Sequence, residues 1–192
     1  MNESRFEGRV ELAESDPAWP QLFAREARRI RRLLGDLVVL LEHTGSTSVP
    51  KLAAKPIIDM LLVVPSSADE PAYVPRLERA GYVLVIREPD WHQHRVFKGP
   101  DTNVNLHVLS SGSEESERVL IFRDWLRAHP EDRRRYERAK RELATREWKT
   151  IQDYADAKTD VVEEIIARAM AALAGDTAAG RAGGPGIARP RV

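Results

Sequence analysis

A short segment in the first third of the chain combines the residue types from which phosphate sites are built. Gly45 and Ser46 form a small turn after an apolar run, and a lone acid, Asp59, stands in a second apolar run. A glycine lets the backbone approach a ligand closely, and the amide and hydroxyl groups of such a turn can donate to phosphate oxygens. A carboxylate in an apolar segment is costly unless something pairs with it. These residues predict a site for an anion and a cation.

Two interpretations of this segment stay open on residue types alone. In the first, Ser46 and Thr47 bind phosphate oxygens and Lys55 adds a positive charge to the site. Asp59 then holds a cation, since Mg²⁺ binds one or two carboxylates together with phosphate oxygens. In the second, the turn is an ordinary one, and Asp59 pairs with Lys55 or Arg95.

The composition narrows the class of protein. Its 192 residues include 30 basic and 30 acidic side chains, so no global field favours a nucleic acid or a membrane surface as partner. The absence of cysteine excludes disulfides and thiol chemistry. No apolar run reaches the roughly 18 residues of a membrane span, and the start of the chain lacks the apolar core of a signal peptide. We therefore expect a cytoplasmic protein.

The pattern of apolar residues predicts strands in the first part of the chain and helices in the second. The expected strands are 10–12, 37–41, 57–64, 82–87, 95–98 and 104–109, with helices over 17–34 and 71–80. The strands 37–41 and 57–64 are expected to be buried on both faces, because they are continuously apolar. The later helices are expected at 114–128, 130–148 and 156–173.

This order of elements predicts an α+β fold in a single domain over residues 1–174. An α/β core of about 10–112 is followed by a helical part of about 113–174. Residues 175–192 are rich in glycine, alanine, proline and arginine and have no apolar period, so we expect them to form a disordered tail.

Ordered motifs run through the chain from about residue 10 to residue 172. The segment 42–64 contains Glu-His, Gly-Ser-Thr, Val-Pro and Ala-Ala-Lys-Pro-Ile-Ile-Asp in this order. Asp-Pro-Ala-Trp-Pro at 16–20 precedes it, and the motifs at 95–98, 105–108, 122–130 and 154–158 follow. With these motifs the chain resembles the GrpB family of the nucleotidyltransferase superfamily.

The resemblance implies a nucleotidyltransferase-like mixed β-sheet flanked by helices, followed by a C-terminal helical bundle. It implies that the Gly-Ser turn positions the phosphates of a nucleotide, and that acids on the next strands hold two metal ions for attack on the α-phosphorus. The usual strand signature of the superfamily is acid, apolar, acid. Here Asp59 is followed two residues later by Leu61, so the second acid is missing.

The resemblance therefore leads us to expect a catalytic and metal-binding set of Asp59 and Glu42, with His107 as a ligand or general base. The expected ion is Mg²⁺ or Mn²⁺, and histidine favours Mn²⁺ over Mg²⁺. It is expected to act with a nucleoside triphosphate, most simply ATP.

Basic residues in the matching motifs are candidates for contacts with the nucleotide. Arg95 is the preferred phosphate ligand of its strand, and Lys98 is expected on the opposite face. His92 and His94 could share a metal ion, but we interpret them as part of a solvated loop.

Two features of the helical half extend this set. Lys140 and Lys158 each follow a tyrosine by four residues, which places each pair on one helical face. Arg123 and Arg127, one turn apart, could form a clamp for an anion. The expected nucleotide-binding residues are Gly45, Ser46, Thr47, Lys55, Arg95, Arg123, Lys140 and Lys158.

Two functions follow from the resemblance. The first is an enzyme that transfers a nucleotidyl group to a small-molecule acceptor, or that adenylates a carboxylate. The second is a non-catalytic nucleotide-binding or folding-assistance module, of the kind fused to dephospho-coenzyme A kinases. The missing second acid favours the module, whereas the retained turn, Lys55 and Asp59 favour the enzyme.

Overall fold

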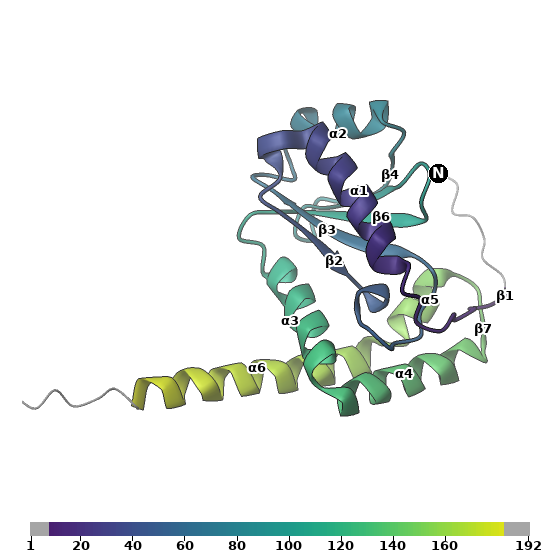
Figure 1. Ribbon diagram of the computed structural model, residues 1–192, viewed down its shortest axis with the longest axis vertical. Coiled ribbons are helices and arrows are strands. Elements are labelled where there is room, and N and C mark those ends of the chain that lie inside the picture. Colours follow the sequence, from purple (N-terminus) through teal and green to yellow (C-terminus); the bar gives the residue numbers. More distant parts are fainter. Residues whose placement is uncertain (1–7, 183–192) are drawn as a thin grey trace, which may run out of the picture.

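A five-stranded mixed sheet forms the centre of the molecule (Figure 1). The computed structural model describes residues 8–182. In spatial order the strands are β2 (Leu40–Thr44), β3 (Ile58–Val64), β6 (Val104–Ser110), β5 (His94–Lys98) and β4 (Val83–Glu88). β3 and β6 pair in parallel, and the other neighbours are antiparallel. The predicted α+β class with a mixed sheet is confirmed.

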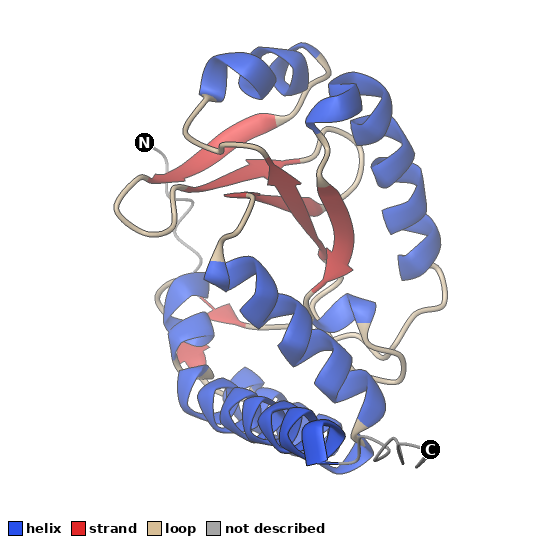
Figure 2. Cartoon of the chain, turned by 90° about the vertical axis from the view of Figure 1, so that its left-hand side faces the viewer, coloured by secondary structure: helices blue, strands red, loops and turns tan. Residues whose placement is uncertain are grey.

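Helices cover both faces of this sheet (Figure 2). α1 (Trp19–Leu34) and α2 (Glu70–Arg79) pack on one face, and α3 (Glu114–Ala128) packs on the other. α4 (Pro130–Ala144) and α6 (Thr159–Ala182) pack on α3, and the short α5 (Ile151–Asp156) lies between them in the chain. Within residues 8–182, no helix has the length and apolar character that crossing a bilayer requires.

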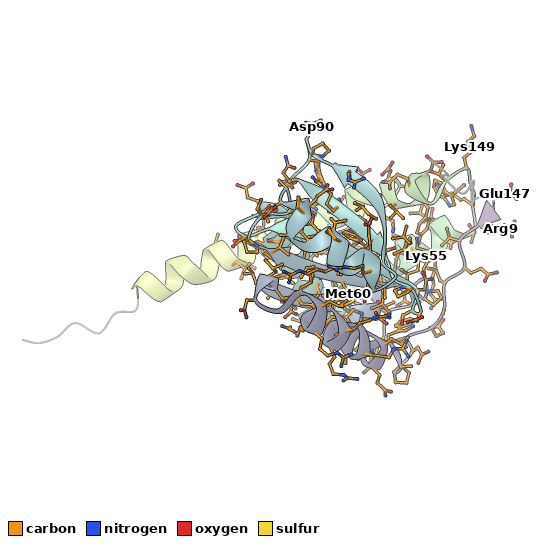
Figure 3. The ribbon with its side chains drawn as sticks, turned by 90° about the horizontal axis from the view of Figure 1, so that it is seen from above. Arg9, Lys55, Met60, Asp90, Glu147 and Lys149 are labelled. Atoms are coloured by element: carbon orange, nitrogen blue, oxygen red, sulfur yellow. The ribbon has the colours of Figure 1, made fainter. Side chains whose placement is uncertain are left out.

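Side chains alternate along β3, so its two faces pack against different parts of the molecule. Met60, labelled in Figure 3, and Leu62 belong to the main core with α1 and α2. Leu61 and Val63 lie on the other face and form a smaller apolar cluster with a leucine of α3. Because Asp59 has the same parity as Leu61, the acid lies on the face that meets the helical half.

Two predicted strands form elsewhere. The run expected at 37–41 begins with a 3₁₀ turn at Gly35–Leu37, where Gly35 has a φ of 57°, so the strand forms instead at Leu40–Thr44. β2 lies at the edge of the sheet and pairs only with β3, so it is not buried on both faces as expected. The strand expected at 10–12 forms at Gly8–Arg9 as β1, which pairs with β7 (Glu147–Trp148).

The helical half also departs from the prediction. α4 ends at Ala144 rather than at residue 148, and the chain then forms β7. α5 begins with a capping box between Thr150 and Asp153 that the sequence analysis missed. α6 continues to Ala182, because its alanine-rich end has high helix propensity, and it therefore includes the first residues of the segment 175–192 expected to be disordered. Residues 183–192 of that segment lie outside the described residues.

Candidate functional site

The Gly-Ser turn lies directly against Asp59. β2 ends at Thr44, which pairs with Asp59 on β3, and Gly45 then turns the chain with a φ of 65°. A Cβ atom at Gly45 would come 2.9 Å from Cγ of Asp59, closer than Cβ atoms approach other groups in proteins. Only glycine can adopt this positive φ and also leave room for the carboxylate of Asp59.

Two arginines of α3 hold both ends of the turn. Arg123 donates from Nη1 to the carbonyl oxygen of His43 at 3.0 Å. Arg127 donates from Nε and Nη2 to the carbonyl oxygen of Ser48 at 3.1 and 2.9 Å. Arg123 also pairs with Glu42 at 2.7 Å. The two arginines were expected to bind an anion together, but they bind backbone carbonyl oxygens of the turn instead. Arg123 is therefore a positioning residue rather than a free phosphate ligand.

Asp59 meets two side chains of the parallel neighbour β6. In the register of the two strands, Asp59 lies opposite Asn105 and Leu61 lies opposite His107. Asn105 donates from Nδ2 to Oδ1 of Asp59 at 2.8 Å, and Nε2 of His107 is 3.9 Å from the same oxygen. Burial alone would raise the pKa of Asp59. The nearby imidazole and the hydrogen bond from Asn105 outweigh burial and hold the pKa below its ordinary value, so the group is a carboxylate.

The expected metal set is not assembled. Asp59 and His107 approach each other, but Glu42 is paired with Arg123. Among the side chains that the structure describes, no group of three or more His, Cys, Asp or Glu is placed to hold a metal ion. Leu61, at the position of the second acid, is buried. These residues do not fit the two-metal centre that the resemblance implies.

Lys140 reaches the turn from α4. Its Nζ donates to Oγ of Ser46 at 3.0 Å and to the carbonyl oxygen of Ala53. It also lies 4.9 Å from the centroid of the Tyr136 ring, which confirms the first predicted Tyr–Lys pair. Burial lowers the pKa of Lys140 to about 7, and the charge of Lys158 adds to this effect.

Two further lysines lie over one aromatic ring. Nζ of Lys158 is 4.4 Å, and Nζ of Lys55 is 5.5 Å, from the centroid of the Tyr154 ring. Burial lowers the pKa of Lys158 to about 8, and the charge of Lys55 contributes. Within the described part of the chain, no carboxylate forms a salt bridge with Lys55, Lys140 or Lys158. The site therefore holds three partly or fully desolvated ammonium groups, and the charge of Asp59 only partly offsets the effect of burial on the pKa values of Lys55 and Lys158.

Two adjoining cavities meet at Asp59. The polar cavity has a volume of about 150 Å³ and is lined by the Gly-Ser turn, Asp59 and the three lysines. The apolar pocket has a volume of about 300 Å³ and lies between the sheet and α3. Four residues line both cavities, so the two cavities are neighbours: Gly45, Ser46, Asp59 and Tyr136.

The structure does not bring Arg95 to these cavities. Arg95 lies on the opposite face of the sheet, where its Nε donates to Oε1 of Glu70 at 2.6 Å, so the preference for it as a phosphate ligand was wrong. Lys98, on the other face of the same strand as expected, donates to Oδ1 of Asn105. Asp59, Asn105 and Lys98 lie opposite one another on three neighbouring strands, so the pairing register brings them to one face of the sheet.

Thr47 reaches the polar cavity but its hydroxyl is already engaged. It donates to the carbonyl oxygen of Ile57 at 3.1 Å and contacts Nε2 of His43 at 3.0 Å. His43 stacks on Phe23 with ring centroids 4.9 Å apart, and burial lowers its pKa to about 4. Both residues therefore support the turn, whereas the hydroxyl of Ser46 faces the cavity and hydrogen-bonds with Lys140 and Tyr136.

The comparisons with known proteins agree with this architecture. The family model described as GrpB protein matches residues 9–168, so the chain belongs to the GrpB family. A UPF0157 protein of Halalkalibacterium halodurans is 62% identical over 162 residues, which are 84% of this chain and 83% of that protein. The crystal structure of the conserved protein GrpB from Enterococcus faecalis superposes with a TM-score of 0.75 at 32% identity, covering 85% of this chain and 99% of that one.

The chain also resembles part of a larger enzyme. A dephospho-CoA kinase of Mycolicibacterium paratuberculosis is 28% identical over 186 residues, which are 83% of this chain but only 46% of the kinase.

The contact between Gly45 and Asp59 can be tested with a matched pair of variants. Gly45→Ala should lower the free energy of unfolding by about 2 kcal/mol and the melting temperature by about 4 to 8 °C, because strain and a collision with the carboxylate add. Gly35→Ala has a similar φ of 57° but open space around its Cβ position, so only the strain of about 1 kcal/mol should remain. Circular dichroism melting curves measure both. Equal losses would contradict the contact.

Proposed function

We propose that this chain binds a nucleoside triphosphate, ATP in the simplest case, in the polar cavity and transfers its nucleotidyl group to a small molecule in the apolar pocket. The observation that carries the proposal is the convergence of Lys55, Lys140 and Lys158 on one cavity with the Gly-Ser turn, in whose lining Asp59 is the one carboxylate among the described residues. The motifs shared with the GrpB family and its nucleotidyltransferase resemblance are the reason to choose a nucleotide among phosphorylated ligands.

The physical argument is the cost of a desolvated cation. An ammonium group that loses water and gains no counter-ion is unfavourable, and a phosphate oxygen removes that penalty. The pKa values of about 7 for Lys140 and about 8 for Lys158 express this cost, because burial favours the neutral amines. A polyphosphate would restore the charged forms, with Ser46 and the backbone of the turn as further donors.

In this proposal lysines neutralise the phosphates, and no step depends on a metal ion held by the protein. An acceptor oxygen attacks the α-phosphorus and pyrophosphate leaves. Asp59 lines both cavities, and His107, which lines the apolar pocket, has its Nε2 3.9 Å from Oδ1 of Asp59. Adenylation of a carboxylate would use the same attack.

A second candidate is a module that binds the nucleotide without turning it over. The leucine at position 61 favours it, because the acid that would complete the superfamily signature is absent. The match to 46% of a dephospho-CoA kinase also favours it, because that kinase holds a similar segment beside a further part of its own chain.

Nucleotide binding should be visible as thermal stabilisation. ATP at about 100 times its dissociation constant should add roughly 2.7 kcal/mol, which raises the melting temperature by about 5 to 10 °C. The measurement is made in EDTA, in Mg²⁺ and in Mn²⁺, with all four nucleoside triphosphates, and EDTA should not remove the effect. Because binding needs protonated Lys140 and Lys158, affinity should fall about tenfold or more between pH 7 and 9.

The stability of the free protein should rise with pH over the range in which the affinity for ATP falls. The pKa values of both lysines are lower in the folded chain, so above about pH 7 the unfolded chain binds more protons and stability rises with pH. A melting temperature that no nucleotide changes under any of these conditions would overturn the proposal.

Lys158→Met separates binding from stability. Methionine keeps most of the side-chain volume and removes a desolvated ammonium group that forms no salt bridge with a described residue, so the melting temperature of the free protein should stay the same or rise. ATP affinity should fall about tenfold or more, because a charge-assisted contact is lost. Lys149→Met is the matched control at an exposed lysine, labelled in Figure 3, and should change neither value. Equal affinities of the two variants would remove Lys158 from the site.

Turnover decides between the enzyme and the module. The native chain should release pyrophosphate from ATP when a panel of small alcohols and carboxylates is supplied. Asp59→Asn keeps the shape of the side chain and removes its charge, so release should fall by about a hundredfold or more. Release that persists in Asp59→Asn would come from another source, and ATP binding without release across the whole panel would establish the module.

A further inference from the structure

Three side chains with rings form a row along the sheet side of the apolar pocket. Trp91 and His94 meet edge to face with ring centroids 5.1 Å apart, and His94 stacks on His107 with centroids 5.2 Å apart. His94 lies on β5 and His107 on β6, so the row crosses two neighbouring strands. All three residues line the pocket, and together they are called the sheet-side row below.

The helices supply two further rings to the same pocket. Phe122 of α3 and Tyr136 of α4 meet edge to face with ring centroids 5.3 Å apart, and both line the pocket. They belong to an apolar cluster with the buried residues Val49 and Leu126, which fixes their positions. This helix-side pair faces the pocket from α3 and α4, so a ligand in the pocket meets rings from the sheet and from the helices.

Trp91 is the most exposed ring of the sheet-side row. It lies in the turn 89–93 between β4 and β5, and Asp90 of this turn is labelled in Figure 3. His92 and Gln93 have φ values of 50° and 51°, a strained conformation that persists only where the surrounding structure requires it. Trp91 is 45% exposed although it lines the pocket. A ligand ring would cover part of this exposed apolar surface.

The size of the pocket limits what it can hold. An apolar cavity of about 150 Å³ in a protein is large enough for benzene. The apolar pocket has a volume of about 300 Å³, so it holds one or two rings with a short side chain.

Two guanidinium groups in the lining do not select a charged ligand. Arg118 pairs with Glu115 at 3.2 Å, and Arg123 pairs with Glu42 at 2.7 Å. Because each already has an acidic partner, recognition of the ligand depends on the rings.

We propose that the apolar pocket binds an aromatic molecule of one or two rings between the sheet-side row and the helix-side pair, and that this molecule is the acceptor of the transfer. Binding of the ring depends on the pocket alone, whereas its role as acceptor rests on the proposed function. Aromatic rings prefer edge-to-face and offset contacts with one another, which gives an aromatic ligand an advantage over a saturated one. The ring takes no part in the bond changes of the transfer, and it fixes where the acceptor lies.

The test compares 2-phenylethanol with 2-cyclohexylethanol by titration calorimetry of the full chain. The two alcohols share a skeleton and differ in whether the ring is aromatic, so the ratio of their affinities reports aromatic contacts. Trp91→Leu and Phe122→Leu each remove one ring and keep an apolar side chain, and each should lower the preference for 2-phenylethanol about threefold or more. Trp148→Leu, at a half-buried tryptophan outside the described lining, is the matched control and should leave the ratio unchanged.

Val119→Trp shows where the alcohols bind. Val119 lines the pocket and is half-buried, so an indole there takes up the space that the ligand needs. Binding of both alcohols should be lost. An affinity ratio that neither leucine variant changes, or binding that survives Val119→Trp, would overturn the inference, as would a native chain that binds neither alcohol.

ATP distinguishes two sources of an aromatic ring, the acceptor and the nucleobase. With ATP present at saturation, the affinity for 2-phenylethanol should stay the same or rise, because the two molecules occupy different cavities. Competition between them would place the nucleobase in the pocket and would overturn the role as acceptor. Binding of 2-phenylethanol by a chain whose melting temperature no nucleotide changes would support the aromatic site and overturn the proposed nucleotide site.

Discussion

The close contact between the backbone of Gly45 and the carboxylate of Asp59 is the constraint on which the site depends. It requires a positive φ and the absence of a Cβ atom, and it requires β2 and β3 to pair so that Thr44 lies opposite Asp59. The arginines of α3 then secure the two ends of the turn, and Ser46 is left facing Lys140. The helical half is therefore part of the site, because its arginines and Lys140 bind the turn directly.

Charge is distributed in this site in an unusual way. The acids that could have held metal ions are either replaced, as at Leu61, or neutralised, as Glu42 is by Arg123. Among the described residues, the three lysines form no salt bridges and share their cavity with a single carboxylate, Asp59. The lowered pKa values of Lys140 and Lys158 show that the free protein carries the cost of their desolvation. Such an arrangement sacrifices stability in the free state and recovers it when an anion binds. This is the behaviour expected of a binding site rather than of a structural ion-pair network.

The sequence predicts the local parts of this arrangement better than the long-range ones. The turn, Asp59 and the contacts within the two Tyr–Lys pairs depend on neighbours in the chain, and the structure reproduces them. Lys158, however, lies in the turn after α5 and not on the same helix as Tyr154. The parity of strand 95–98 was also right, but parity does not say which face of an inner strand meets the helical half, so Arg95 was preferred. Contacts such as Glu42 with Arg123, which lie 81 positions apart, follow only from how α3 packs on the sheet.

Leu61 brings these observations together. In the register of the sheet it lies between Glu42 on β2 and His107 on β6, so an acid there would stand beside both and would complete a metal centre. Leucine at this position leaves Glu42 to Arg123 and leaves His107 to the hydrogen bond with His94. One apolar side chain thus stands where the resemblance implies an acid, and it lines the apolar pocket. If lysines take over the charge of the phosphates, the missing acid marks a change in how the substrates are held, and loss of catalysis does not follow from it.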